Sequence, residues 1–115
     1  MGKTPDECLS KLMPVRDALD VFQGKWKIQI ISALIYYEEC GFKQLKDTVI
    51  GITPKMLSKE LKDLEMNLLV KREVTDTRPV TITYSITEYG KTCSEVIKAL
   101  YNWGQKHRET IINRD

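Results

Sequence analysis

Residues 51–65 read GITPKMLSKELKDLE, and this stretch decides the fold. Thr53 belongs to the residue types that cap helix N-termini, and Pro54 suits the first helical position. The pair therefore predicts a helix that runs from Pro54 to about Met66. Asn67 is expected to end it by adopting the left-handed conformation.

The predicted helix has two chemically different faces. At 100° per residue, its leucines fall within about 60° of arc and its lysines within a similar arc on the opposite side. We expect the leucines to anchor the helix on a core while the lysines face solvent. The leucines are Leu57, Leu61, Leu64 and Leu68, and the lysines are Lys55, Lys59 and Lys62.

Acidic residues weaken a simple electrostatic interpretation of this helix. Glu60, Asp63 and Glu65 cancel the three lysines, so the net charge of the helix is zero. Lysines on a solvated face often serve only solubility. By their spacing, however, Glu60 and Asp63 are expected to lie to one side of the lysine arc, leaving a cationic face of the width that a DNA major groove admits.

The segments on both sides complete a recognisable order. Alternating β-branched and aromatic residues predict two strands of a hairpin, with the turn Asp76–Pro79 between them. The predicted elements are helices from about Pro14, over Lys25–Tyr37 and over Phe42–Val49, strands near 70–75 and 81–86, and a last helix over 88–112 capped by Thr87. This order predicts a mainly α fold with a small β-hairpin: a winged helix-turn-helix with an added dimerisation helix.

Composition places the chain among soluble single-domain proteins. It has 115 residues and a net charge of +2, so a case for a polyanionic partner depends on where the lysines lie. No apolar run is long enough to span a membrane, and the first twelve residues, which have no apolar stretch, are not expected to act as a signal peptide. The three cysteines form no C-x-x-C pair, which favours reduced thiols and a cytoplasmic location. We expect a flexible tail over residues 1–12 and one domain over 13–115.

Nothing in the sequence points to an enzyme, a cofactor or a metal. His107 is the sole histidine, and no glycine-rich phosphate loop is present. Glu38 and Glu39 are adjacent, but neighbours on a helix point about 100° apart and do not converge. We therefore predict a binding protein.

The last helix carries a heptad-like row of residues. Its members recur at alternating steps of four and three, a spacing typical of helix–helix association. Gly104 is a candidate break in this helix. The row consists of Tyr89, Cys93, Val96, Leu100, Trp103 and His107.

With these motifs assembled, the sequence resembles the HxlR-type winged helix-turn-helix family of bacterial and archaeal transcriptional regulators. The resemblance covers roughly Met13 to Gly104. It rests on six motifs in order: GKWKIQII (24–31), FKQL (42–45), GITPKMLSKELKDLE (51–65), LLVKR (68–72), YSITEYG (84–90) and LYNWG (100–104).

The resemblance implies a homodimer, more often a repressor, that binds double-stranded DNA at a pseudo-palindromic operator with half-sites about 34 Å apart. It implies that the helix from Thr53 is the recognition helix, that the hairpin is the wing, and that the first and last helices form the dimer contacts. The candidate dimer residues are Val15, Leu19, Phe22, Val96, Leu100, Trp103 and His107. The candidate DNA-binding residues are Lys43, Gln44, Thr53, Lys55, Met56, Ser58, Lys59, Lys62 and Arg78, the last at the wing tip.

Four positions depart from the family pattern. Met13 stands where many members have a sensing cysteine, which leaves Cys8 as the candidate redox sensor. Leu68 replaces the usual glycine after the recognition helix, so the turn is assigned to Asn67. Gly41 and Thr81 replace frequent basic residues, and Arg78 then becomes the main cation of the wing.

A second hypothesis stays open on sequence alone. The chain can be a protein-interaction or small-molecule-sensing module that no longer reads DNA, since fold alone does not fix function. The aromatic residues that could line a pocket for an unknown effector are assigned to the core instead. They are Phe22, Tyr36, Tyr37 and Tyr101.

Overall fold

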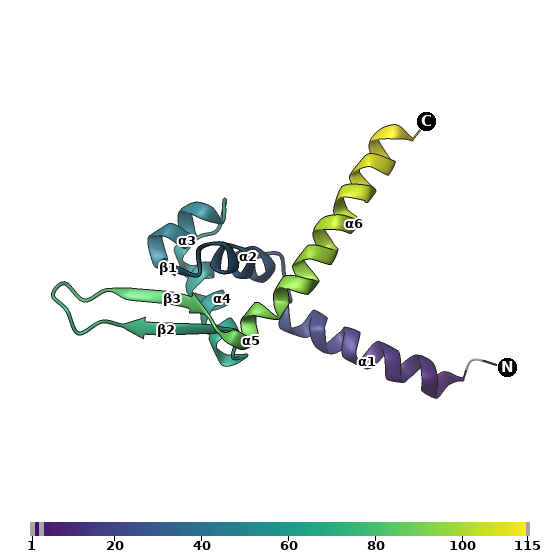
Figure 1. Cartoon of the computed structure of the whole chain (residues 1–115), viewed down its shortest axis with the longest axis horizontal. Helices are drawn as coiled ribbons and strands as arrows, with labels where there is room; N and C mark the ends of the chain where they lie inside the picture. Colours follow the sequence, from purple (N-terminus) through teal and green to yellow (C-terminus); the bar gives the residue numbers. More distant parts are fainter. Residues whose placement is uncertain (1, 3, 115) are drawn as a thin grey trace.

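The helix of the opening stretch is α4, which spans Pro54–Met66 as predicted. Thr53 is its N-cap, and its Oγ1 accepts a hydrogen bond from the Met56 backbone N–H at 3.1 Å. The structure is a computed structural model that describes residue 2 and residues 4–114. Figure 1 shows α4 at the centre of the domain, beside α2 and the strands.

The other elements follow the predicted order with one added strand. A three-stranded antiparallel sheet has the order β1-β3-β2. The elements are α1 (Pro5–Val21), α2 (Lys27–Tyr37), β1 (Glu39–Gly41), α3 (Phe42–Thr48), β2 (Val70–Val74), β3 (Ile82–Ile86), α5 (Glu88–Lys91) and α6 (Cys93–Asn113).

The core lies where α2, α3, α4 and the sheet meet. The leucine face of α4 packs there as expected, with Leu57, Leu61 and Leu64 fully buried. It meets the buried face of α2, and Tyr84 and Ile86 close the core from the sheet. The buried residues contributed by α2 are Ile30, Ile31, Ala33 and Leu34, with Lys27 among them.

The first helix begins earlier than predicted. Thr4 caps α1 by accepting the Glu7 N–H at 3.2 Å, and Pro5 follows it, so Thr4-Pro5 repeats the signal of Thr53-Pro54. Pro14, the predicted start, lies inside the helix. Residues 5–12, assigned to a tail from the sequence, are therefore helical, while residues 1 and 3 lie outside the described residues.

The strand β1 was not predicted. Gly41 was expected only to break the preceding helix, but Glu38, at φ 70°, ends α2 first and the chain turns into the sheet. Cys40 then pairs with Tyr84 of β3 and is buried. Three residues are too few to show an alternating pattern, so this strand depends on its partner rather than on its own sequence.

The last helix breaks at Thr92 and not at Gly104, which lies within α6. The Thr87 hydroxyl accepts the Gly90 N–H at 2.8 Å and donates to the Leu68 and Leu69 carbonyls at 2.7 and 3.1 Å. A Cβ at Gly90 would collide with the Leu69 carbonyl. Thr87 therefore caps only the short α5 and ties it to the end of α4.

The turn after α4 is made by Leu68 and not by Asn67. Asn67 has φ −89°, whereas Leu68 has φ 66°. The sequence pattern places Leu68 on the buried leucine face, but its side chain is 69% exposed and does not belong to that face. A non-glycine residue therefore sits in the left-handed region, which costs about 1–2 kcal/mol for a residue with a Cβ.

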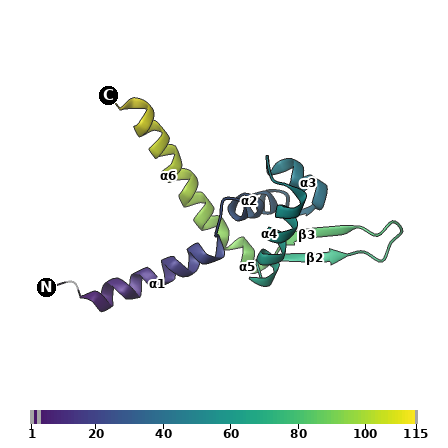
Figure 2. The ribbon, with the colours of Figure 1, turned by 180° about the vertical axis from the view of Figure 1, so that it is seen from behind.

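Two helices extend away from this domain. Figures 1 and 2 show α1 and α6 diverging from its side opposite the β2–β3 hairpin. The radius of gyration is 17.6 Å, compared with about 13 Å for a compact chain of about 100 residues. Within the described residues, no helix combines the length and apolarity needed to cross a membrane.

We predict that Leu68→Gly raises the free energy of unfolding by about 0.5–1 kcal/mol, because glycine adopts positive φ without strain. The relief of strain exceeds this value, but the greater backbone entropy of glycine in the unfolded chain offsets part of it. Met66→Gly is the matched control, since Met66 is equally exposed but helical, and it should lower stability by up to about 1 kcal/mol. Urea denaturation measures both. A loss of stability in Leu68→Gly would show that Leu68 is not strained.

Candidate nucleic-acid interface

Helix α4 is held against α2 by a buried ion pair. Lys27 Nζ donates to Glu60 Oε2 at 2.9 Å and lies 3.3 Å from Asp63 Oδ2. Lys27 is 6% exposed and Glu60 is 4% exposed, so this pair lies inside the protein. Two of the three acids on α4 therefore interact with a cation from behind the helix.

Burial by itself lowers the pKa of Lys27, but the hydrogen bonds and charges of Glu60 and Asp63 outweigh it, and the net pKa is raised. A raised folded-state pKa means that the ion pair stabilises the fold fully below the unfolded pKa of lysine. That stabilisation is lost only as the pH rises through the folded pKa. Lys27 is therefore charged at neutral pH, and the pair persists there.

The lysines of α4 face solvent as predicted. Lys55, Lys59 and Lys62 are all exposed. The Lys59 side chain is 67% exposed, and its Nζ stands 3.8 Å from Glu60 and 3.9 Å from Asp63. Contrary to the sequence analysis, the acids are thus not clear of the lysine arc, because Lys59 and Lys27 approach the same two carboxylates.

The remaining predicted residues of α4 are accessible from the same side. Met56 and Ser58 are exposed, and Thr53 is exposed at the N-cap. Ser58 and Lys62 also line a cleft of about 290 Å³ between α4 and the sheet, opposite Arg72 of β2. Glu65 lies in this cleft too. Arg72 was missed from the sequence, where it counted only as one residue of a strand.

Helix α3 presents the other predicted residues of the helix-turn-helix. Lys43 and Gln44 are both exposed on its first turn. Lys43 Nζ lies 2.9 Å from Asp47 one turn later, and the hydrogen bond and charge from Lys43 lower the pKa of Asp47. An exposed pair of this kind contributes little stability. Lys43 can therefore exchange Asp47 for another anion.

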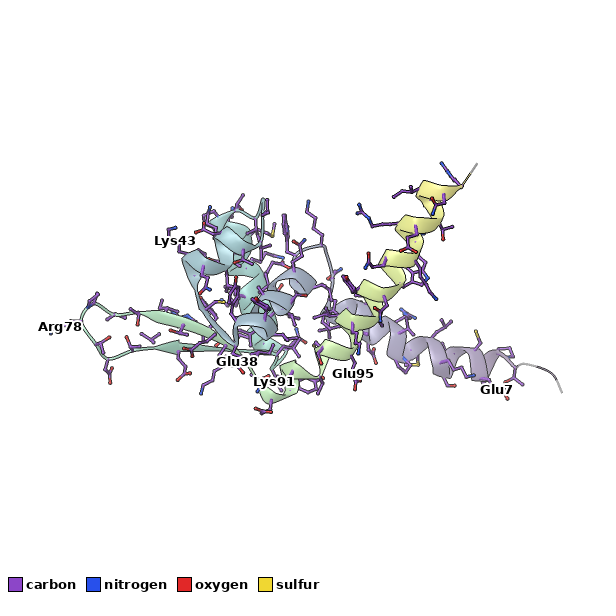
Figure 3. All side chains as sticks on the ribbon, turned by 45° about the horizontal axis from the view of Figure 1, so that its top comes forward. Glu7, Glu38, Lys43, Arg78, Lys91 and Glu95 are labelled. Carbon is purple, nitrogen blue, oxygen red and sulfur yellow. The ribbon has the colours of Figure 1, made fainter. Side chains whose placement is uncertain are left out.

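The hairpin β2–β3, with its loop 75–81, forms the wing. Thr75 Oγ1 lies 2.8 Å from Thr77 Oγ1 and 2.9 Å from Thr81 Oγ1, and it accepts the Thr81 N–H at 3.0 Å. These threonines brace the base of the loop, a feature missed from the sequence. Figure 3 shows Arg78 at the wing tip and Lys43 on α3, both at the end of the domain remote from Glu7 on α1.

The three thiols differ in environment. Cys8 is exposed on α1, whereas Cys40 and Cys93 are buried. Burial raises the pKa of Cys40 and of Cys93, which disfavours their thiolate forms. Cys93 therefore belongs to the core rather than to an exposed row on the last helix, and Cys8 is the accessible thiol.

The tyrosines assigned to the core are exposed instead. Tyr36 is 80% exposed, and Tyr37 and Tyr101 are also on the surface. Tyr36 and Tyr101, with Ile35 and Ile97, line an open apolar groove of about 500 Å³ between α2 and α6. Phe22 is partly buried and packs against the core as expected.

Comparison with known proteins identifies the family. The profile described as HxlR-like helix-turn-helix matches residues 21–112. The chain belongs to this family. Its members are transcriptional regulators rather than enzymes, and the winged helix-turn-helix predicted from the sequence is confirmed. The HxlR-type chain is therefore a DNA-binding transcriptional regulator.

Individual relatives agree with the family assignment. The HTH-type transcriptional regulator YdeP of Bacillus subtilis is 35% identical over 98 residues, which are 85% of this chain and 76% of YdeP. The reduced form of the redox regulator HypR superposes with a TM-score of 0.80 at 32% identity, covering 88% of this chain and 99% of that one. The structure of the transcriptional regulator YtcD superposes with a TM-score of 0.75 at 33% sequence identity, covering 87% of this chain and 97% of the YtcD chain.

Within residue 2 and residues 4–114, no cluster of three or more His, Cys, Asp or Glu residues is placed to hold a metal ion. The chemistry of the interface is that of exposed lysine, arginine, amide and hydroxyl groups. These groups bind phosphates and base edges.

We predict that Lys27→Met lowers the free energy of unfolding by about 3–5 kcal/mol, because it removes the buried cation that lies 2.9 Å from the buried Glu60 carboxylate. Adding Glu60→Leu removes that carboxylate and should return stability to within about 1–2 kcal/mol of the wild type. Chemical denaturation of the two variants measures the coupling. Additive losses in the double variant would mean that the two side chains do not stabilise each other.

Proposed function

We propose that this regulator is a homodimer that binds a pseudo-palindromic operator and represses transcription in the cytoplasm. The main support for a dimer is the solvent exposure of α1. None of the residues of Pro5–Val21 is buried, although the helix carries several large apolar side chains. An isolated helix of this length is marginally stable in water, so α1 needs a partner surface.

The same argument applies to α6. Leu100 and Trp103 are exposed on this helix, and the Trp103 ring stacks on His107 with centroids 5.0 Å apart. Exposed apolar rows of this size mark association surfaces. A second copy supplies matching rows, which agrees with the dimer residues inferred from the sequence: Val15, Leu19, Phe22, Val96, Leu100, Trp103 and His107.

In the proposed complex, α4 enters the major groove and the wing lies beside it. Phosphate contacts come from Lys43, Lys55, Lys59, Lys62 and Arg78, to which the cleft adds Arg72 as a candidate. Base edges are read by Thr53, Lys55, Met56, Ser58 and Lys59, with Gln44 contributing from α3. The exposure of these residues and the two projecting helices together support this arrangement.

Control of binding by a thiol or a ligand is part of the same proposal. HypR is a redox regulator with structures in reduced and oxidised forms. In this chain Cys8 is the exposed thiol, beside Glu7 and Lys11 on α1. Oxidation at Cys8 would alter a helix that the proposed dimer buries.

The apolar groove between α2 and α6 favours an added role for this regulator, the sensing of a small apolar molecule. Its volume lies in the range of ligand sites. Retention of the wild-type protein on random duplex at low salt, with release by salt, is expected with or without such a ligand, because phosphate contacts dominate non-specific binding.

We predict that Lys59→Glu weakens binding to a duplex selected from a random pool by at least about tenfold while the dimer survives, because it replaces a phosphate contact with repulsion. Lys91→Glu is the control, since Lys91 lies on α5 and pairs with Glu88 at 3.1 Å. Fluorescence anisotropy measures both. Equal affinities of Lys59→Glu and wild type would remove α4 from the interface.

We predict that Leu100→Glu converts the dimer to monomers, because it places a charge in the buried apolar row of the proposed interface. Asn102→Glu, two residues along and on the opposite side of α6, should leave the dimer intact. Light scattering after size exclusion gives the mass of each. A monomeric wild type, or a dimeric Leu100→Glu, would contradict the proposed interface.

A further inference from the structure

Two lysines from different elements approach the same two carboxylates of α4. Lys27 comes from α2 on the core side and lies 2.9 Å from Glu60 and 3.3 Å from Asp63. Lys59 approaches from the solvent side, at 3.8 and 3.9 Å from the same residues. The shorter distances belong to the buried lysine, so Lys27 is the principal partner of both acids.

We propose that Lys27 is a positioning residue for DNA binding, which acts by keeping Lys59 available to the phosphate backbone. The inference rests on the proposed role of Lys59 as a DNA contact. Lys27 itself is buried, and it contacts Glu60 and Asp63 from the core side of the helix. Its single positive charge offsets one of their two negative charges, so one negative charge instead of two is left to attract Lys59.

The charges of α4 give the physical reason. Alone, the helix has three lysines and three acids and no net charge. With Lys27 bound to Glu60 and Asp63, four lysines stand against three acids, and the group as a whole carries a net charge of +1. Without Lys27, two carboxylates would face Lys59 alone, and its flexible, exposed side chain would close the remaining distance to form direct ion pairs.

The position of Asp63 makes this competition separable from folding. Its side chain is 40% exposed, so it can be left unpaired in water, whereas the side chain of Glu60 is only 5% exposed and cannot. Replacing Lys27 and Glu60 together by apolar residues therefore removes the buried pair but leaves one carboxylate next to Lys59. Stability and DNA binding should then respond differently.

The test compares Lys59→Gln in two backgrounds, wild type and Lys27→Met/Glu60→Leu. In wild type, Lys59→Gln should reduce the slope of log affinity against log salt by about 1.8 for the dimer, the loss of one phosphate contact in each subunit. In the double background, Asp63 already holds Lys59, so the same change should have a smaller effect. Affinity of that background should fall about two- to fivefold, the strength of one exposed pair one helical turn apart in each subunit.

Adding Asp63→Asn to the double background should restore both the affinity and the full effect of Lys59→Gln. A purely structural role for Lys27 predicts instead that DNA binding recovers together with stability in the double variant. An equal effect of Lys59→Gln in both backgrounds would overturn the inference. If the wild-type protein does not bind duplex, or if Lys59→Gln has no effect on its binding, the proposed DNA-binding role of Lys59 is wrong, and the inference about Lys27 is not what failed.

A second pair of variants covers the case in which the apolar double variant does not fold. Lys27→Gln with Glu60→Gln replaces the buried ion pair by neutral amides that can still hydrogen-bond to each other. The same comparison of Lys59→Gln is made in this background. The same results are expected, and the same results would overturn the inference. In this background Lys27 is again gone, so of the two lysines only Lys59 is left to pair with Asp63.

Discussion

The ion pair between Lys27 and Glu60 is the interaction on which the rest of the structure depends. It joins the central helix of the core to the helix that carries the exposed lysines, and it is buried on the inward side of α4 together with the leucines. A buried pair of this kind adds little net stability over an apolar contact, since desolvation offsets its attraction. Its contribution is orientation: with Glu60 directed at Lys27, the leucine face and the lysine face of α4 take their places together.

This pair also resolves a conflict present in the sequence. The net charge of α4 is zero, which argues against a polyanion as partner, yet its lysines converge on one face. Charge summed along a helix treats all side chains as equally exposed. In the structure one acid is buried and a second shares its partner, so the charge presented to solvent differs from the charge written in the sequence.

The sequence predicted the elements whose signals are local. The limits of α4 follow from a cap, a proline and leucines within its own length, and the wing from alternation and a turn. Features that depend on distant residues were not predictable from the sequence. Strand β1 needs β3 as its partner, and the Thr75–Thr81 hydrogen bond of the wing joins residues six apart. Lys27 has the pattern of an ordinary helical lysine, and only the fold brings it to Glu60. The start of α1 is a different case, because Thr4-Pro5 and Pro14 both carry a local helix-start signal and the sequence alone does not rank them. In the candidate site, exposure of the lysine arc could be predicted, while the competition for Glu60 and Asp63 could not.

The hydroxyl of Thr87 links α5 to the turn that follows α4. One oxygen caps α5, at the root of the long C-terminal helix, and also donates to the carbonyls that follow α4. The short segment from Thr87 to Thr92 therefore connects the turn after α4 to α6, which is about 31 Å long over its 21 residues. These bonds fix α5 relative to the turn after α4, whereas the break at Thr92 lies beyond them, so the angle of α6 is set at a different point of the chain from its anchorage.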